Sequence, residues 1–378
     1  MIKEQSTKGK TSDYLRAAAE QFSSEDQIFE ILPFGDGKVN DTFLVNTASG
    51  HEKYFILQRI NQRVFRRPEL IMQNLRVLSG HVSKRLTNNP IASRRWEMPS
   101  VLPTADSKDY WIDPGGFFWR AISFIDDSES LETVTGHGQA AEAGFAVGLF
   151  HSLVIDLPAE RLNDTLAGFH MTPVYLQRYQ AILESSSDRL SPDAAYCMDF
   201  INRRKEFAHV LESAKADGRL PLRVIHGDPK VSNIMIDTVT RLAVSIVDLD
   251  TVKPGLILYD IGDSLRSCCN PHGEDPRLEE VHFEPELCRA LLKGYFSAAE
   301  NFLSEHEREF IYDSVRLIAF ELGMRFFTDY LEGNVYFKVT DRRQNLRRAL
   351  VQFRLTESIE SQAKSLHSII KESSVVSL

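Results

Sequence analysis

Three side chains in residues 224–236 (VIHGDPKVSNIMI), Asp228, Lys230 and Asn233, have types and spacing that suit phosphoryl transfer. An Asp in such a loop accepts the proton of a substrate hydroxyl, and an Asn five residues later holds a magnesium ion. A Lys two residues after the Asp can face the transferring phosphate. The leading hypothesis is therefore ATP-dependent phosphoryl transfer, with Asp228 and Lys230 as the catalytic residues.

A second acidic segment follows at residues 243–251 (AVSIVDLDT), where a β-branched apolar run ends at Asp248 and Asp250. Magnesium prefers hard oxygen ligands and keeps waters and substrate phosphates in its octahedron, so a carboxylate and an amide oxygen suffice as protein ligands. We expect Asn233 and Asp248 to be these ligands. Asp before Pro-Lys is also a common turn composition, but a second acidic strand end so close by favours the catalytic interpretation. His226 is expected to brace the loop by hydrogen bonds.

Composition excludes several classes of function. The chain has 378 residues, 43% hydrophobic and 26% charged, and a net charge of −9, which argues against a nucleic-acid partner. No stretch reaches the roughly 18 apolar residues of a membrane helix, and the N-terminus lacks a secretory apolar region. Four cysteines without metal-binding spacing fit reduced thiols. We expect a cytoplasmic protein that binds magnesium, ATP and a small molecule, with no nucleic-acid or membrane partner.

The order of predicted elements indicates two lobes. Strands are predicted at residues 28–32, 42–45, 54–60, 110–113 and 117–125, with a helix opening at Pro68. After residue 126 the pattern is mainly helical, around 138–155, 172–184, 193–214, 286–302, 306–332 and 341–371, with strands only at 222–250. We predict an α+β, bilobal, protein-kinase-like fold: an antiparallel-sheet N-lobe (1–125) that binds nucleotide, and a helical C-lobe (126–378) that carries the catalytic loop. Phe124 and Ile125, at the hinge, are candidates for the adenine contact, although a buried strand end would look the same.

The first predicted hairpin carries a short glycine loop, residues 35–42 (GDGKVNDT), in which Gly35 and Gly37 would let backbone N–H groups approach phosphate oxygens. Such a loop is by itself more often a plain turn. The strand at 54–60 should then carry a Lys for the phosphates, but Gln58 stands in that register and Arg59 points to the opposite face. The phosphate charge would then be neutralised by Lys230, Lys38 and magnesium, or by Arg59 if its side chain bends around the strand. Otherwise the nucleotide would bind weakly.

Together these segments resemble the aminoglycoside phosphotransferase and choline kinase superfamily and, within it, most closely the N-acetylhexosamine 1-kinases, which phosphorylate the anomeric hydroxyl of N-acetylglucosamine and N-acetylgalactosamine. The resemblance covers most of the chain. It rests on residues 226–233 (HGDPKVSN), 246–255 (IVDLDTVKPG), 258–266 (LYDIGDSLR), 33–37 (PFGDG) with Asn40, 55–58 (FILQ), 169–173 (FHMTP), 221–224 (PLRV), 323–326 (GMRF), 329–333 (DYLEG) and 336–337 (YF).

The resemblance implies that Asp228 is the general base, that Asn233 and Asp248 bind magnesium, and that Arg325 and Tyr336 contact the sugar. A surface ion pair for Arg325 and core packing for Tyr336 are equally compatible with the sequence. Lys38 stands where the acetylhexosamine kinases carry a His that faces the sugar, which leaves the identity of the sugar open. A cation at position 38 would favour an acidic or differently substituted sugar. Alternatively, the Lys38 side chain would turn toward ATP.

Other functions are compatible with parts of this pattern. Homoserine, choline or aminoglycoside phosphorylation stays open within the kinase class, and the absent strand Lys is compatible with an inactive, ATP-binding pseudokinase. Residues 248–251 (DLDT) also look like the nucleophile motif of haloacid dehalogenase phosphatases. Only ten residues separate Thr251 from Gly262, too few for the crossover which that fold requires.

Overall fold

The computed structural model describes residues 14–23, 28–35, 37, 39–48, 53–91, 94–185, 191–299 and 302–375. The chain divides into two compact units. The first comprises residues 1–80 with 97–126, and the second comprises residues 81–96 with 127–378. All four cysteines are buried and free.

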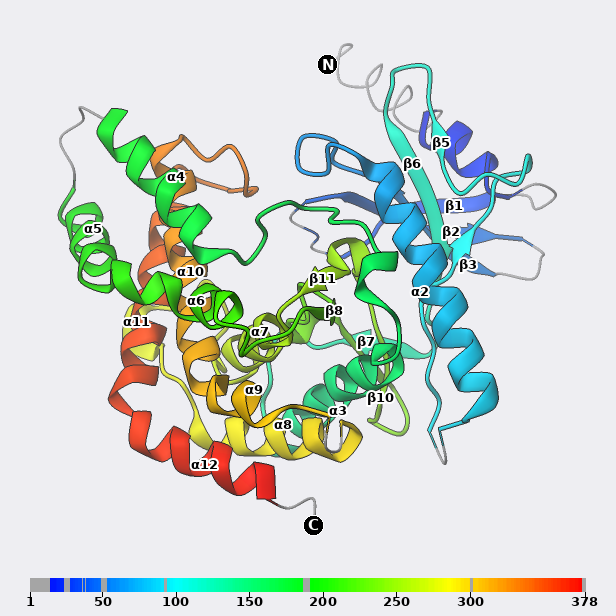
Figure 1. The fold of residues 1–378 in the computed structure, drawn as a ribbon. Helices are drawn as coiled ribbons and strands as arrows, with labels where there is room; N and C mark the ends of the chain where they lie inside the picture. Colours follow the sequence, from blue (N-terminus) through cyan, green and yellow to red (C-terminus); the bar gives the residue numbers. More distant parts are fainter. Residues whose placement is uncertain are drawn as a thin grey trace. The chain divides into compact units, whose positions relative to one another are not determined.

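Unit 1 is built on an antiparallel sheet (Figure 1), with strand order β1-β2-β3-β6-β4 and β5 paired to β6. The strands are β1 (Ile28–Pro33), β2 (Asp41–Thr47), β3 (Tyr54–Arg59), β4 (Val101–Leu102), β5 (Trp111–Ile112) and β6 (Phe118–Ser123). Sequence patterning predicted every strand of this sheet except β4. Helix α2 (Pro68–Asn88) follows β3 and begins at the predicted proline, whose fixed φ suits the first helical turn.

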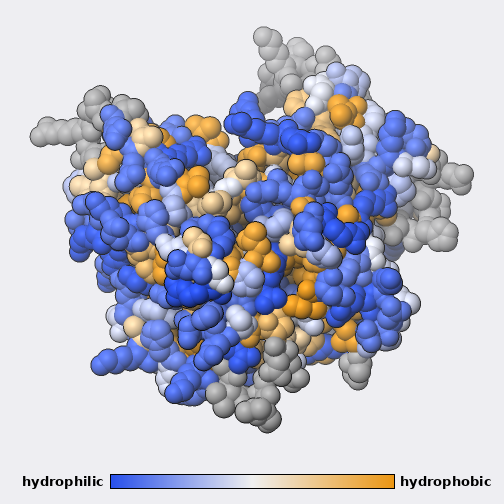
Figure 2. Space-filling view, in the orientation of Figure 1, coloured by the Kyte–Doolittle hydropathy of each residue, from blue (hydrophilic) through white to orange (hydrophobic). Residues whose placement is uncertain are grey.

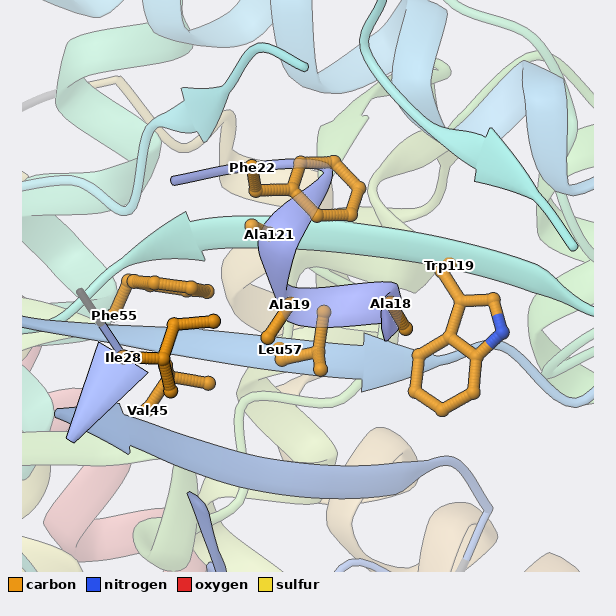
Figure 3. Packing of buried hydrophobic residues seen from close by; sticks show 9 residues of the cluster. All are labelled: Ala18, Ala19, Phe22, Ile28, Val45, Phe55, Leu57, Trp119 and Ala121. Carbon is orange, nitrogen blue, oxygen red and sulfur yellow. The ribbon is translucent and has the colours of Figure 1, made fainter. Parts of the chain in front are cut away.

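Side chains alternate across this sheet, so odd-numbered positions of β3 and β6 share one face. Phe55, Leu57, Trp119 and Ala121 on that face pack with residues of the short helix at 14–20 and with its flanking Phe22, as Figure 3 shows. Even-numbered positions, among them Gln58 and Arg120, therefore lie on the opposite face. This alternation decides which polar side chains of the sheet can act together.

Unit 2 is mainly helical, and its helix boundaries correct several predictions. The segment predicted as one helix at 193–214 is α5 and α6 separated by a 3-10 turn at Lys205–His209, and the last two predicted helices are each divided in two. The sequence patterning did not predict α7. The helices are α3 (His137–Val154), α4 (Thr172–Ser185), α5 (Pro192–Arg204), α6 (Val210–Ala216), α7 (Ile257–Cys268), α8 (Pro285–Ala298), α9 (Glu305–Glu309), α10 (Ile311–Leu331), α11 (Gln344–Ser361) and α12 (Ala363–Val375).

Two small antiparallel sheets lie among these helices, one with strand order β10-β9-β7 and one that pairs β11 with β8. Their strands are β7 (Ser128–Ser130), β8 (Arg223–Ile225), β9 (Ile234–Asp237), β10 (Ala243–Ile246) and β11 (Lys253–Gly255). β7 and β11 fall outside the 222–250 region to which strands were expected to be confined. Each is only three residues long, too short for a recognisable alternating pattern.

Hydrophilic side chains cover most of the face drawn in Figure 2, with smaller hydrophobic areas between them. Among the residues that the structure describes, no helix is both long enough and apolar enough to cross a bilayer.

Candidate active site

The loop between β8 and β9 brings together the three side chains selected from the sequence. Lys230 Nζ donates to Asp228 Oδ2 at 2.8 Å, and Asn233 Nδ2 donates to the Asp228 carbonyl at 2.7 Å and to Oδ2 at 3.2 Å. The Asp228 and Lys230 side chains keep 28% and 31% of their surface exposed. The carboxylate is thus oriented by two neighbours and still accessible to a substrate hydroxyl.

The charges in this loop hold both partners ionised. Burial alone would raise the pKa of Asp228, but the Lys230 ammonium outweighs it and keeps that pKa below its ordinary value. Burial would also lower the pKa of Lys230, but the negative charges of Asp228 and Asp248 raise it instead. An ionised Asp228 is the form that can accept a proton.

Asp248 follows β10 with its backbone in the left-handed region, at φ 64° and ψ 55°. The charges of Asp228 and Asp248 both raise the pKa of Lys230, so the Lys230 ammonium lies near both carboxylates. Because the Asn233 amide nitrogen is committed to Asp228, its oxygen is the atom left to bind a cation. The described residues contain no cluster of three acidic, His or Cys ligands. Two protein oxygens from Asn233 and Asp248, completed by phosphates and water, are a donor set that fits magnesium.

Helix α7 anchors the loop at three points along one of its faces. Asp260 accepts from the backbone N–H groups of His226 and Gly227 at 2.6 and 2.8 Å. One turn later Ser264 Oγ donates to the Pro229 carbonyl at 3.1 Å, and Ser267 Oγ accepts from the Val231 N–H at 3.2 Å. Positions i, i+4 and i+7 share a helix face, so a single element holds the loop on both sides of Asp228.

The Asp260 carboxylate is fully buried and has a third donor, His151 of α3, whose Nε2 lies 2.9 Å from Asp260 Oδ2. The other ring nitrogen of His151 lies 3.0 Å from the Tyr295 hydroxyl of α8. With Nε2 donating to the carboxylate, Nδ1 accepts from the Tyr295 hydroxyl. Helices α7, α3 and α8 are therefore linked beneath the loop by Asp260, His151 and Tyr295 in turn.

Gly227 adopts φ +88°, and a Cβ at this position would lie 2.7 Å from the Thr251 carbonyl oxygen. Only glycine fits here, because both the conformation and the space exclude a side chain. Thr251 Oγ1 donates to the His226 carbonyl at 2.9 Å, while His226 Nε2 lies 3.0 Å from the Val247 carbonyl and Nδ1 accepts from Asp228 N–H at 3.2 Å. His226 makes the bracing hydrogen bonds expected of it, and burial lowers its pKa.

Arg325, on α10, is largely buried, with 12% of its side chain exposed, and its guanidinium lies over aromatic rings. Its Cζ is 5.0 Å from the ring centres of Phe169 and Tyr175 and 5.7 Å from that of Phe337. Nη1 is 3.8 Å from Glu321, and burial raises the pKa of Tyr175, which stays a neutral phenol. The sequence also allowed Arg325 to form a simple ion pair on a helix surface. In the structure its guanidinium is instead surrounded by aromatic rings, which orient it.

Tyr336 lies in a loop that Asp329 holds in place. The Asp329 carboxylate accepts from the backbone N–H groups of Val335, Tyr336 and Phe337 at 2.8, 2.7 and 3.0 Å, and from Asn345 Nδ2 at 2.8 Å. Tyr336 is half-buried, and the ring centre of its neighbour Phe337 lies 5.7 Å from Arg325 Cζ. The loop thus presents Tyr336 near Arg325.

In unit 1, Gly35 has a left-handed backbone, at φ +69°, and Gly37 lies in the same loop. The Asn40 side chain is buried, and its Oδ1 accepts from the Asn61 N–H at 3.0 Å, which ties the loop to the segment after β3. Lys38, the predicted sugar contact, lies outside the described residues.

Gln58 occupies the strand position at which a Lys was expected. Its Nε2 donates to Thr42 Oγ1 at 3.1 Å, and its Oε1 accepts from Arg120 Nε and Nη2 at 2.9 and 2.7 Å. Arg59 instead donates to Asp41, its cross-strand neighbour, at 2.6 Å. The cation next to Gln58 therefore comes from β6.

The hinge candidates differ in exposure. Phe124 is half-buried, with its ring centre 5.8 Å from those of Phe34 and of Tyr54, while Ile125 is buried. The ring contacts of Phe124 and the burial of Ile125 account for both side chains as packing residues, so any adenine contact here would come from their backbone.

Sequence reasoning did not single out the residues that position the site. Asp260 and Ser264 lay within a segment used only for resemblance, and Ser267 and Glu321 were not considered. His170, in the segment 169–173, also proves to touch the catalytic loop: its Nε2 lies 2.7 Å from the Gly227 carbonyl. The available signal was the density of polar residues in 258–267, which exceeds what a buried helix usually carries.

Residues 30–299 match the family model described as the phosphotransferase enzyme family, APH. Because this match covers more than half of the 378 residues, the chain belongs to that family.

Solved structures with the same fold include an aminoglycoside phosphotransferase from Alicyclobacillus acidocaldarius (TM-score 0.61, 14% identity, 94% of this chain and 96% of that one). A microcompartment-associated aminopropanol kinase matches with a TM-score of 0.57 and 16% identity over 94% of this chain and 98% of the other. A choline kinase from Cryptosporidium parvum matches with a TM-score of 0.55 and 14% identity over 90% and 91%. At these identities the likeness concerns the fold, and it confirms the predicted kinase-like α+β architecture.

Proposed function

We propose that this protein is an ATP-dependent kinase that phosphorylates a hydroxyl group of a small molecule, with Asp228 as the general base. The observation that carries the proposal is the arrangement around Asp228: an ionised carboxylate, oriented by Lys230 and Asn233, partly exposed, and held from below by α7. Membership of a phosphotransferase family agrees with this chemistry.

In this mechanism Asp228 orients the acceptor hydroxyl and takes its proton during attack on the γ-phosphorus. Lys230 neutralises charge on the transferring phosphoryl group, and little other covalent work is asked of the protein. Asn233 and Asp248 would hold magnesium, which supplies further charge neutralisation on the phosphates when bound. In unit 1, backbone N–H groups around Gly35, Gly37 and Asn40 would contact the phosphates, and the backbone at 124–125 the adenine.

For the acceptor, we propose a sugar of the N-acetylhexosamine type or a close relative, bound by Arg325 and Tyr336. The charges near Arg325 support this choice. Arg325 and His170 face a single carboxylate, Glu321, so the group carries two cations for one anion if His170 is protonated. A cationic acceptor such as choline or an aminoglycoside would be repelled here, whereas a neutral sugar offers oxygen acceptors to the guanidinium. Lys38 is proposed as a further contact with the acceptor or with ATP.

The decisive experiment is a phosphorylation screen with Mg-ATP. Acceptors should include N-acetylglucosamine, N-acetylgalactosamine, simple hexoses, homoserine, choline and kanamycin, with products read by phosphorus NMR and ADP release. We expect a phosphosugar whose signal is the doublet of an anomeric phosphate. Preferential phosphorylation of choline or kanamycin would contradict the sugar assignment but keep the kinase, and no ADP release with any acceptor would favour an inactive nucleotide-binding protein.

Asp228→Asn tests the assignment of the base. A general base contributes about a hundredfold to ten-thousandfold to turnover, so kcat should fall by that factor. The matched control is Asp199→Asn, the same change at an exposed acid that pairs with its helical neighbour Arg203. Near-normal turnover in Asp228→Asn would exclude Asp228 as the base.

A further inference from the structure

We propose that His170 is a positioning residue, held as a buried imidazolium that links Arg325, through Glu321, to the backbone carbonyl immediately before Asp228. The inference rests on the proposed function, because it assigns a role in placing the catalytic base and in coupling it to acceptor binding. His170 does not touch the reacting atoms.

Both hydrogen-bond partners of the His170 ring are acceptors. His170 Nδ1 lies 3.0 Å from Glu321 Oε1, and Nε2 lies 2.7 Å from the Gly227 carbonyl oxygen. A carbonyl oxygen can only accept, and the pKa of Glu321 is held below its ordinary value by His170, Arg325 and Thr172 against the effect of burial, so it too is an acceptor. A neutral imidazole has a single N–H. Both hydrogen bonds form together only if the ring carries two protons.

The surroundings of the ring agree with this count. Burial would lower the pKa of His170, but the charge of Glu321 and, less strongly, that of Asp263 on α7 raise it above its ordinary value, against the opposing charge of Arg325. The Tyr259 ring of α7 lies 5.4 Å away and contributes no charge, because its own pKa is raised by burial. The contacting Glu321 carboxylate therefore favours the imidazolium, while Asp263 is itself ion-paired with Arg266 and contributes less.

The backbone at His170 indicates that this placement is maintained at a cost. His170 adopts φ +64°, a left-handed conformation that is uncommon for non-glycine residues, although His takes it more often than most. The following turn leads into α4, where Thr172 Oγ1 donates to Glu321 Oε2 at 2.7 Å. Both oxygens of Glu321 are thus bound by the segment 170–172, which fixes the imidazole between α10 and the catalytic loop.

Acceptor binding and the position of the catalytic loop are coupled because Arg325 and His170 share Glu321. Oε1 of Glu321 receives His170 and also lies 3.8 Å from Arg325, the proposed sugar contact. A change in the position of Arg325 on acceptor binding therefore acts on the same carboxylate that holds His170 against Gly227. Deprotonation of His170 would remove one of its two hydrogen bonds and loosen the loop, so turnover should fall as pH rises through the raised pKa of this residue.

The first test reads the proton directly. The protein is labelled with ¹⁵N-histidine, and ring nitrogens are observed by NMR from pH 6 to 9, with the His170→Asn variant used to assign the signal. We expect both ring nitrogens of His170 to be protonated at neutral pH and one proton to be lost only above the ordinary titration range of histidine. A neutral single tautomer at pH 7 would overturn the proposal.

The second test measures the loop and turnover in His170→Asn, chosen because Asn tolerates the left-handed backbone. Amide hydrogen exchange at residues 226–231 should be faster by about tenfold, a modest coupling between two sites. Exchange in the unit 1 sheet should be unchanged. With the best acceptor from the screen, kcat should fall by about tenfold and should no longer decrease at alkaline pH. The change in kcat should be larger than the change in the KM for ATP. The control is His282→Asn, at a histidine whose side chain is 47% exposed.

The outcomes separate the two proposals. Unchanged exchange at residues 226–231, or a His170→Asn profile that keeps the wild-type alkaline decline, would overturn the role of His170. A doubly protonated ring and faster loop exchange in a protein that phosphorylates no acceptor would instead overturn the proposed function and leave the structural link intact.

Discussion

Replacing Asp260 by Asn tests whether one buried carboxylate anchors the catalytic loop. Asp260 accepts three hydrogen bonds: Oδ2 from the His226 N–H at 2.6 Å and from His151 at 2.9 Å, and Oδ1 from the Gly227 N–H at 2.8 Å. Asn has the same shape but a single acceptor oxygen. In its better orientation the amide oxygen keeps the two donors at Oδ2, and the amide NH₂ group then faces the Gly227 N–H, which cannot accept.

The size of the effect follows from these contacts. The variant loses a hydrogen bond to a charged group, worth about 1.5–3 kcal/mol, and leaves at least one buried donor unsatisfied, at about 1–3 kcal/mol. We expect the free energy of unfolding of unit 2 to fall by about 3 kcal/mol or more, and kcat to fall because the backbone on both sides of Asp228 loses its anchor. Urea unfolding followed by the helical circular dichroism signal measures the first, and steady-state kinetics the second.

Asp199→Asn is the matched control, since the Asp199 side chain is 61% exposed and should change unfolding by less than about 0.5 kcal/mol. A variant Asp260→Asn with a free energy of unfolding within the same range as this control, and with unchanged kcat, would refute the reasoning that this carboxylate holds the loop. A large loss of stability with normal kcat would show that the anchor supports the fold but not the geometry of the base.

Other changes test separate parts of the structure. Gly227→Ala forces a side chain into a left-handed position 2.7 Å from the Thr251 carbonyl, and should lower the free energy of unfolding by about 3 kcal/mol, measured by urea unfolding. Asp329→Ala removes the acceptor for three backbone N–H groups of the loop at 335–337, and should raise the acceptor KM by about tenfold with a smaller effect on kcat. Gln58→Leu removes two hydrogen bonds to the buried Arg120 guanidinium and should lower stability by about 2 kcal/mol or more, seen in the tryptophan fluorescence of unit 1 during unfolding. An unchanged KM, an unchanged unfolding midpoint for Gly227→Ala, or a neutral Gln58→Leu would each contradict the corresponding contact.

Local spacing was enough to predict the chemical centre of the candidate site. Asp228, Lys230 and Asn233 lie within six residues, so their side chains meet through a single turn whatever the rest of the chain does. The strands around them were also readable, because β9 and β10 form a tight antiparallel pair with β-branched residues. A motif confined to one loop is therefore recoverable from the sequence alone.

Helix α7 was missed for a physical reason. Periodicity predicts a helix when polar residues gather on a solvent face, but eleven of the twelve residues of α7 are buried, Asp260, Asp263 and Arg266 among them. Gly262 in its middle reads as a helix breaker. In the structure a Cβ there would lie 2.7 Å from the Ser314 carbonyl of α10, so the glycine permits close helix packing. A buried polar helix cannot be distinguished from a loop by patterning.

Contacts between distant segments were equally inaccessible. His170 meets Gly227 across 57 positions and Glu321 across 151, and neither pairing leaves a local signature. The sequence showed only a short polar segment, FHMTP, whose value came from resemblance. The charge state of His170, and with it the preference that we propose for an uncharged acceptor, depends on which atoms face the ring in the folded chain.

The absent strand lysine shows why one position of a motif is a poor measure of the charge around it. Reading along β3 gives a neutral Gln58 and an Arg59 that is bound to Asp41 on the other face of the sheet. Reading across the sheet gives Thr42, Gln58 and Arg120 in one row, joined by hydrogen bonds between their side chains. The Gln58 amide oxygen orients the Arg120 guanidinium. A basic side chain therefore lies on the face from which the lysine is missing, but it comes from β6 and is found only by following the cross-strand pairs.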